Sequence, residues 1–190
     1  MFAIIGLGNP GEEYAHTRHN AGFETVDLLA EELGVTYWKT TCGALVGSGK
    51  ITLNGVRVEV LLVKPQSFMN LSGGPVSHLC KEYGLGVDDL IVVHDELDIP
   101  STSIRVKKGG GHAGHNGLRS IIDKIGSRDF YRVRVGVGRP PGKMKVPDYV
   151  LSVPRKEAKD DFDAVCYKAS RAVLSLMEVG LEKTQAEFNA

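Results

Sequence analysis

Side chains able to move a proton from water stand at two separated points of the chain. His19 lies in a polar stretch that follows the apolar N-terminus, and Asp95 comes directly after the apolar run 90–93. An imidazole has a pKa of about 6.5, so it can accept a proton at cellular pH, and a carboxylate on its other nitrogen fixes the tautomer and stabilises the imidazolium. We interpret His19 as a general base and Asp95 as its partner.

Three asparagines accompany this pair: Asn9 in the turn after the first apolar run, Asn70 in a Phe-Met-Asn-Leu-Ser-Gly stretch, and Asn116 in a glycine-rich segment. Uncharged amides can hold a water, a carbonyl group or a developing oxyanion. The chain has no serine or cysteine in a nucleophile motif such as GxSxG. Direct attack by water is therefore the simplest mechanism for this set of residues. Considered one at a time, these residues have simpler interpretations: Asn9 can be a turn residue, and His19 can be a surface histidine without a catalytic role.

The residues do not favour a metal site or a disulfide framework. His16-x-x-His19 and His112-x-x-His115 have ligand-like spacing, but no cysteine or second acidic cluster is spaced to complete a metal site. The three cysteines are an odd number and lack CxxC spacing. We expect reduced thiols, no metal and no cofactor.

The glycines Gly6, Gly8 and Gly11 match the GxGxxG fingerprint of dinucleotide-binding proteins. That fingerprint requires a helix to begin at the third glycine and an acidic residue about 20 positions later, at the end of the next strand. Here helical periodicity begins only after Asn20, and the next strand is expected near Ala44. Residues 107–111 likewise lack the Gly-Lys-Ser/Thr order of a phosphate-binding P-loop. Neither nucleotide-binding interpretation is supported.

The charge distribution differs sharply along a chain of zero net charge (23 Lys and Arg against 23 Asp and Glu). Residues 101–156 contain 13 basic and 3 acidic side chains, a net charge of +10. Such a block can bind a polyanion while the whole protein stays neutral. The alternative is that acidic residues elsewhere neutralise it in three dimensions. The block contains these basic residues among others: Arg105, Lys107, Lys108, Arg132, Arg134, Arg139, Lys143 and Lys145.

The elements that must position these residues alternate between strand and helix. Length and 42% hydrophobic content fit one domain spanning residues 1–190. Asn54-Gly55 predicts a type I′ hairpin between two strands, so part of the sheet is antiparallel. We predict an α/β fold, a single-domain three-layer α/β/α sandwich around a mixed sheet. The predicted strands are 2–5, 44–53, 56–63, 90–93, 104–106 and 131–137; the predicted helices are 23–33 (capped by Asn20), 71–83, 118–125 and 155–179; residues 107–117 are predicted to be a mobile loop.

Four motifs, in this order, resemble bacterial-type peptidyl-tRNA hydrolase over nearly the whole chain. They are GLGNPGxxYxxTRHN from Gly6 to Asn20, KPxxFMNxSG from Lys64 to Gly73, HDELD from His94 to Asp98, and GGGHxGHNGL from Gly109 to Leu118. The sequence departs from many relatives at residues 74–75 and 139–143, which affects the start of one helix and one loop.

The resemblance implies an α/β/α sandwich and hydrolysis of the ester that joins a peptide to the 3′ ribose of tRNA, without a metal. It implies that His19 is the general base, that Asp95 sustains its basicity, and that Asn9 distinguishes a blocked peptidyl chain from a free aminoacyl group. Asn70 and Asn116 would position substrate and water. Further residues implied are Tyr14, Phe68, Met69 and His115 at the tRNA end, and Lys107 and Arg134 on tRNA phosphate.

The expected partner is therefore the acceptor end of peptidyl-tRNA, and the resemblance implies a monomer. We expect a cytoplasmic location, because no targeting segment or membrane span is apparent. One alternative is a non-catalytic RNA-binding relative of the same fold. Another is a hydrolase of simple peptides or nucleosides, whose activity would not depend on polyanion contacts.

Overall fold

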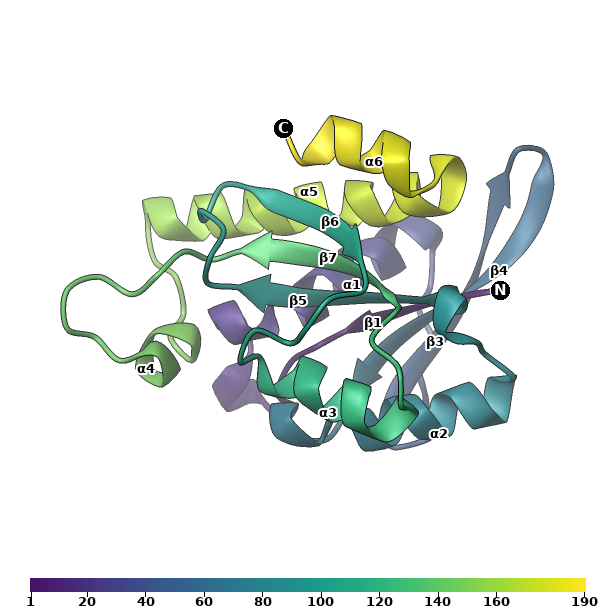
Figure 1. Ribbon diagram of the computed structural model, residues 1–190, viewed down its shortest axis with the longest axis horizontal. Helices are drawn as coiled ribbons and strands as arrows, with labels where there is room; N and C mark the ends of the chain where they lie inside the picture. The colour runs from purple at the N-terminus through teal and green to yellow at the C-terminus, as the bar shows by residue number, and fades with distance from the viewer.

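The computed structural model describes residues 1–190 and is built on one seven-stranded sheet with the strand order β2-β3-β4-β1-β5-β7-β6 (Figure 1). Parallel pairs join β1 to β4, β1 to β5 and β5 to β7, and the β2–β3, β3–β4 and β6–β7 pairs are antiparallel. The sheet is thus mixed, as predicted. The strands are β1 Phe2–Gly6, β2 Lys39–Thr41, β3 Ala44–Leu53, β4 Val56–Pro65, β5 Leu90–Glu96, β6 Ile104–Lys108 and β7 Tyr131–Gly136.

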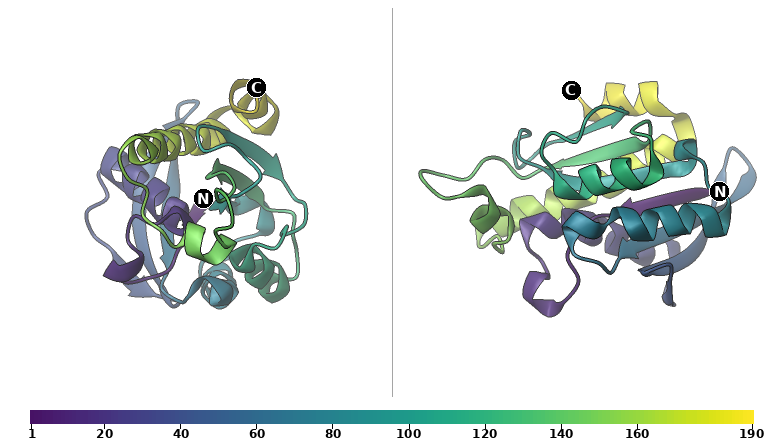
Figure 2. Two further views of the ribbon diagram at one scale, coloured as in Figure 1. Left: turned by 90° about the vertical axis from the view of Figure 1, so that its left-hand side faces the viewer. Right: turned by 60° about the horizontal axis from the view of Figure 1, so that its bottom comes forward.

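Helices cover both faces of the sheet, so the predicted three-layer sandwich is confirmed (Figure 2). Helices α1 and α5 pack on one face with a core of 23 buried residues, and α2 and α3 pack on the other with a core of 16. The segment leading to α4 extends beyond the sheet (Figures 1 and 2). No helix is long and apolar enough to cross a membrane. The helices are α1 Ala21–Leu33, α2 Gly73–Tyr83, α3 Asn116–Ile125, α4 Val146–Val150, α5 Glu157–Val179 and α6 Leu181–Phe188.

Local sequence signals place most element boundaries correctly. Asn54 and Gly55 have φ values of 50° and 80°, as a type I′ turn between β3 and β4 requires. The second helix begins at Gly73 rather than at Leu71, because residues 69–71 form a separate 3₁₀ turn. Asn116 is the first residue of α3 rather than part of the preceding loop. The short elements β2, α4 and α6 were not predicted.

Two of the three glycines of the GxGxxG match, Gly6 and Gly8, serve packing. A Cβ at Gly6 would lie 2.3 Å from the carbonyl oxygen of Gly22 in α1, and a Cβ at Gly8 would lie 2.7 Å from the ring of Phe23. A Cβ at Gly22 would in turn lie 2.4 Å from the carbonyl oxygen of Val93. Glycine at these positions lets α1 cross directly over β1 and β5. The rejection of a dinucleotide-binding loop agrees with this geometry.

The outer edge of β6 is covered by α6 and the residue after it. The side-chain oxygen of Asn189 accepts a hydrogen bond from the Val106 N–H at 2.7 Å. The Val106 carbonyl accepts one hydrogen bond each from the Asn189 and Gln185 amides, both at 3.0 Å. Side chains therefore satisfy the middle of an edge strand that has no further strand beside it.

Candidate active site

A cleft of about 400 Å³ opens where β1 and β5 end. Two loops frame it: the N-terminal loop (residues 7–20) and the glycine loop (Gly109–His115). The polar side of the cleft combines the predicted base, its carboxylate and all three asparagines. The lining residues are Asn9, His19, Phe68, Met69, Asn70, Asp95, Glu96, Leu97, Ala113, Gly114, His115, Asn116, Val146, Pro147, Val150 and Leu151.

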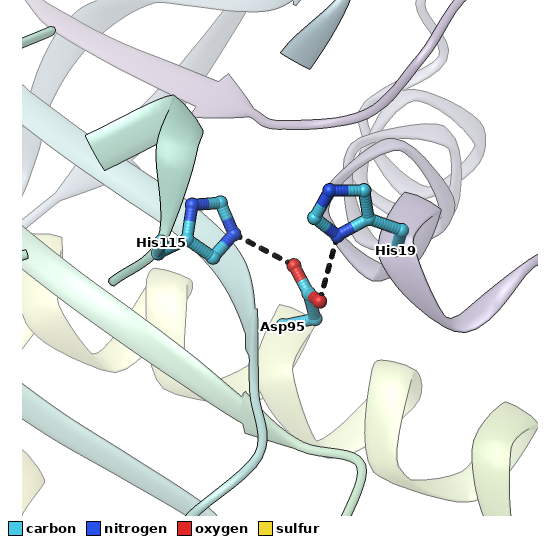
Figure 3. A group of neighbouring side chains, drawn as sticks. All are labelled: His19, Asp95 and His115. Carbon is cyan, nitrogen blue, oxygen red and sulfur yellow. Dashed lines mark hydrogen bonds and ion pairs between the residues drawn. The ribbon is translucent and has the colours of Figure 1, made fainter. Parts of the chain in front are cut away.

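Asp95 lies between two histidines at the bottom of this cleft (Figure 3). Its Oδ2 is 2.8 Å from Nδ1 of His19, and its Oδ1 is 2.8 Å from Nε2 of His115. The Asp95 side chain is only 4% exposed. The predicted His19–Asp95 contact is present, and His115 is a second partner of the same carboxylate, on its other oxygen.

The backbone around His115 fixes its tautomer. His115 occupies the N-cap of α3, where its Nδ1 accepts hydrogen bonds from the backbone N–H groups of Gly117 and Leu118. Nδ1 is therefore unprotonated, and Nε2 carries the proton that His115 donates to Asp95. The other carboxylate oxygen is left to accept from Nδ1–H of His19. The Nε2 lone pair of His19 then faces away from Asp95, where a base needs it (Figure 3).

Electrostatics favour this assignment. Burial by itself would raise the pKa of Asp95, but the two imidazoles hold it below its ordinary value, so the carboxylate stays charged at neutral pH. Burial would lower the pKa of His19, but the charge and hydrogen bond of Asp95 outweigh it and raise that pKa above 6.5. His19 is thereby made a stronger base than a free imidazole.

A third histidine packs behind the pair. The ring of His94, the residue before Asp95 on β5, lies edge-on to His115 with the ring centroids 5.0 Å apart. Burial, together with the neighbouring His115, lowers the pKa of His94 to about 3. His94 is therefore neutral and supports the ring of His115 by packing. In the sequence, only the adjacency of His94 to Asp95 hints at this contact.

Asn9 is held in one orientation by its neighbours. Its backbone N–H donates to Oδ1 of Asn20 at 2.8 Å, and its carbonyl accepts from Nδ2 of Asn20 at 3.0 Å. Its own Oδ1 accepts from the Met69 N–H at 2.6 Å, which turns the side-chain NH₂ of Asn9 toward the cleft that it lines. Asn20, predicted to cap α1, makes no side-chain cap bond, because its amide is used on Asn9 instead.

The other predicted residues divide between the cleft and its surroundings. Asn70, Asn116 and the half-exposed Phe68 line the cleft, and Met69 is buried at its wall. Tyr14 does not line it; its ring stands edge-on to that of Phe68 at 6.1 Å. The apolar wall of the cleft was not predicted, because its residues come from the unpredicted α4 and from positions just after α4 and β5: Leu97, Val146, Val150 and Leu151.

Lys107 and Arg134 lie outside the cleft, on neighbouring strands β6 and β7. Arg134 pairs with Glu96, a cleft residue, at 3.0 Å. Burial and the nearby guanidinium groups of Arg134 and Arg132 lower the pKa of Lys107. The two predicted phosphate contacts thus adjoin the active site on one side.

The basic block is partly neutralised, so both interpretations of it are partly correct. Lys108 pairs with Asp88 and Arg139 with Asp98, which lie in the acidic first part of the chain. Arg132 is fully buried and cannot belong to a solvent-facing surface.

His19, Asp95 and His115 also carry ligand types that suit a divalent metal, with ligand atoms within 4.8 Å of one another. In this arrangement each imidazole nitrogen is at hydrogen-bond distance from its own carboxylate oxygen. The hydrogen-bonding pattern accounts for all three side chains, and the expectation of a metal-free enzyme remains a prediction. Of the two histidine pairs noted in the sequence, His16 pairs with Glu24 and His112 accepts from the Gly114 N–H.

Comparisons with known proteins agree with the motifs. Residues 3–190 match the family model described as peptidyl-tRNA hydrolase. The chain is 46% identical over 189 residues to the peptidyl-tRNA hydrolase of Syntrophotalea carbinolica, covering 100% of this chain and 97% of that one. It is 48% identical over 187 residues to that of Frankia alni, covering 98% and 93%.

Among solved structures, the crystal structure of peptidyl-tRNA hydrolase from Acinetobacter baumannii superimposes with a TM-score of 0.89 at 38% identity, covering 100% of this chain and 95% of that one. Fold, motifs and full-length similarity therefore lead to one assignment. The chain belongs to the peptidyl-tRNA hydrolase family and is a carboxylic ester hydrolase.

Proposed function

We propose that His19 removes a proton from water while the water oxygen attacks the acyl carbon of the ester between the peptide and the tRNA 3′ ribose. The imidazolium formed is stabilised by Asp95 and returns its proton to the ribose oxygen as the C–O bond breaks. The products are a peptide carboxylate and a tRNA with a free 3′ hydroxyl. Release of tRNA from prematurely ended chains is the role that this reaction serves.

The orientation of Asn9 supports a role in selecting blocked substrates. Its NH₂ group faces the cleft as a donor, since its oxygen is occupied by the Met69 N–H. The carbonyl of a peptide bond can accept from this group, whereas the ammonium of a free aminoacyl group has no lone pair to accept with. Asn9 therefore favours peptidyl-tRNA over aminoacyl-tRNA.

The remaining cleft residues position the two sides of the ester. Asn70 and Asn116 are exposed to the cleft and make no bond within the protein, so their amides are free for substrate and for the attacking water. Phe68, backed by Tyr14, offers an exposed ring on which the terminal base can stack, with Met69 and His115 beside it.

Lys107 and Arg134 bind phosphates of the acceptor end of tRNA. Both side chains project from the same face of the β6–β7 pair, next to Glu96 at the cleft. A cationic pair beside the reacting ester fits a polyanionic substrate and gives activity that weakens with salt. The enzyme acts as a monomer in the cytoplasm, without a metal or cofactor.

One observation carries this proposal: Nδ1 of His19 is bound to a buried carboxylate while its Nε2 is left free at a cleft lined by three asparagines. The test is incubation with N-acetyl-aminoacyl-tRNA and with unblocked aminoacyl-tRNA, followed by acid-precipitable label. The blocked substrate is expected to be cleaved much faster, and His19→Ala to lose about 10⁴-fold in kcat/KM.

His78→Ala is the matched control, because His78 is exposed on α2 and does not line the cleft. It should retain wild-type activity. Equal cleavage of the blocked and unblocked substrates would contradict the role proposed for Asn9. Wild-type activity in His19→Ala would contradict the assignment of His19 as the general base.

A further inference from the structure

Arg132 is a fully buried arginine on β7 without a carboxylate partner. Its register partner on β6 is Lys107, and the two side chains project from the same face of the sheet. A buried guanidinium is normally neutralised by an acidic side chain, since desolvation of an unpaired charge is costly. This one donates from Nη1 and Nη2 to backbone carbonyls only, and its Nε has no hydrogen-bond partner.

Two of those carbonyls belong to consecutive residues of the glycine loop. Nη1 of Arg132 donates to the Gly111 carbonyl at 2.6 Å, and Nη2 donates to the Gly110 carbonyl at 2.5 Å. Nη2 also donates to the carbonyl of Arg128 at 3.0 Å. The guanidinium plane lies over the ring of Phe130, 4.6 Å from its centroid. The guanidinium is planar and is itself held by the Phe130 ring and the Arg128 carbonyl. It therefore fixes the Gly110 and Gly111 carbonyls relative to the sheet.

The first half of the loop, Gly109–Gly111, has one other hydrogen bond, from the Gly109 N–H to the Phe130 carbonyl at 3.0 Å, whereas His112 accepts bonds from the N–H groups of Gly114 and His115 in the second half. Gly109 and Gly110 have φ values of 76° and 100°, and a Cβ at Gly110 would lie 2.8 Å from Nζ of Lys107. The loop therefore passes directly over the ammonium of Lys107. Five residues after Gly110, His115 of the same loop donates to Asp95. One short segment therefore connects Lys107, the proposed phosphate contact, to the catalytic carboxylate.

We propose that Arg132 is a positioning residue: by holding the carbonyls of Gly110 and Gly111 it fixes the glycine loop, and through it the placement of His115 and Asn116 at the reacting ester. The inference rests on the proposed function of the cleft. It differs from a phosphate-binding role, because a fully buried guanidinium that donates to three backbone carbonyls does not touch tRNA. Loss of the Arg132 side chain should therefore slow the chemical step on any substrate, whereas loss of the Arg134 side chain should weaken only the binding of tRNA.

The experiment compares Arg132→Met, Arg132→Lys and Arg134→Gln on two substrates, N-acetyl-aminoacyl-tRNA and N-acetyl-aminoacyl-adenosine, which lacks the tRNA phosphates. Arg132→Met should lower kcat about ten- to hundredfold on both substrates, the loss expected from misplacing catalytic groups by about 1 Å. It should leave the dependence of kcat/KM on salt unchanged. Arg132→Lys should lose less, because an ammonium can still reach one of the two carbonyls. Arg134→Gln should raise KM and weaken the salt dependence on tRNA only.

Arg57→Met is the matched control, since Arg57 is exposed on β4 at the hairpin. Gly110→Ala provides a second route to the same loop, independent of the sheet interior: its φ of 100° strains an alanine, and kcat should fall on both substrates. Gly86→Ala, where φ is negative and the added Cβ meets only Asp89 at 3.7 Å, is its control. Imidazole ¹⁵N spectra of Arg132→Met should show that His115 no longer holds a single Nε2–H tautomer.

Three outcomes would overturn the inference. A weakened salt dependence with unchanged kcat in Arg132→Met would make Arg132 a phosphate contact. A lower Tm with unchanged kcat and unchanged His115 spectrum would make it a purely structural residue. If Arg132→Met fails to fold, unchanged kcat in Gly110→Ala would overturn it equally. A wild-type enzyme inactive on both substrates would instead contradict the proposed function, and the His115 spectrum would still test Arg132.

Discussion

The N-terminal loop and the glycine loop each bring one histidine to the same carboxylate, but they are held in opposite ways. In the N-terminal loop, Asn20 bonds to both backbone polar groups of Asn9, and Thr17 bonds to the carbonyl of Tyr14. The first half of the glycine loop, Gly109–Gly111, is held from outside, by Arg132 of β7 and the Phe130 carbonyl. The side chain that holds the backbone of Asn9 thus comes from the same loop, whereas the groups that hold Gly110 and Gly111 come from the sheet.

This difference extends to the two histidines. His115 has both ring nitrogens engaged, one by the start of α3 and one by Asp95, so it can only donate to the carboxylate. His19 has only Nδ1 engaged and keeps a free Nε2. The fixed tautomer of one imidazole therefore determines which carboxylate oxygen remains for the other, and the comparison can be tested by changing the carboxylate between them.

The largest effect is expected from Asp95→Asn. The amide oxygen must face the proton on Nε2 of His115, because that tautomer is fixed, so the amide NH₂ must face Nδ1 of His19. His19 then carries its proton on Nε2 and cannot act as a base. We expect a loss of about 10³- to 10⁴-fold in kcat/KM, measured with N-acetyl-aminoacyl-tRNA. Asp98→Asn, at an exposed position of the same segment, should change activity little; equal losses in both variants would contradict the argument.

A double variant sharpens the asymmetry. In Asp95→Asn combined with His115→Ala, nothing holds the amide in one orientation, and its oxygen can turn to Nδ1 of His19. The double variant should therefore be more active than Asp95→Asn alone by about tenfold, which is about one-quarter to one-third of the single loss on a logarithmic scale. Additive losses in steady-state kinetics would mean that His115 does not control the orientation of residue 95.

The support within the N-terminal loop is tested by Asn20→Ala. The variant removes two buried hydrogen bonds to the backbone of Asn9, which should lower the free energy of unfolding by about 1–3 kcal/mol. It should also release Asn9, so the preference for N-acetyl-aminoacyl-tRNA over aminoacyl-tRNA should fall about tenfold. Denaturant unfolding and paired kinetics measure the two effects. If the variant loses stability but keeps the wild-type preference for the blocked substrate, Asn20 has no role in substrate selection.

The pH profile reports the bond between His19 and Asp95. Only the neutral imidazole is a base, so kcat/KM should rise with pH through the pKa of His19 and then level off. Because Asp95 raises that pKa, the midpoint in the free enzyme should lie above 6.5. In Asp95→Asn the residual activity should rise at lower pH than in the wild type. A midpoint at higher pH in Asp95→Asn would contradict the conclusion that Asp95 raises the pKa of His19.

The smallest effect is expected from metal removal. Each imidazole nitrogen that faces Asp95 is at hydrogen-bond distance from a carboxylate oxygen, and the mechanism needs no Lewis acid. Dialysis against EDTA should leave kcat/KM within about twofold of the untreated value. A large loss restored by a divalent cation would show that His19, Asp95 and His115 bind metal instead.

The two loops also explain what the sequence could predict. The N-terminal loop carries its own polar side chains, so its motif identifies His19 and Asn9, and the pairing with Asp95 follows from the strand ends. The support of the glycine loop comes from Arg132, about twenty residues later and alternating with valines in a strand, where it resembles any other member of a basic block. Nothing local distinguishes a buried arginine from an exposed one.

The elements that escaped prediction are short or depend on distant contacts. Strand β2 has three residues and α4 has five, too few for a periodic pattern. The apolar wall of the cleft comes largely from α4, and it was missed for the same reason. The double role of His115 depends on the start of α3 at Asn116, two residues before the predicted start at Leu118.

The amide groups that meet Val106 have a consequence for the behaviour of the protein at high concentration. An uncovered edge strand is a template for pairing with the edge of another molecule, the first step toward aggregation. At one edge of this sheet the strand is only three residues long, and at the other Gln185 and Asn189 occupy the backbone groups that an incoming strand would need. Truncation of the C-terminal helix should therefore reduce solubility before it reduces turnover, since the catalytic residues lie at another part of the sheet.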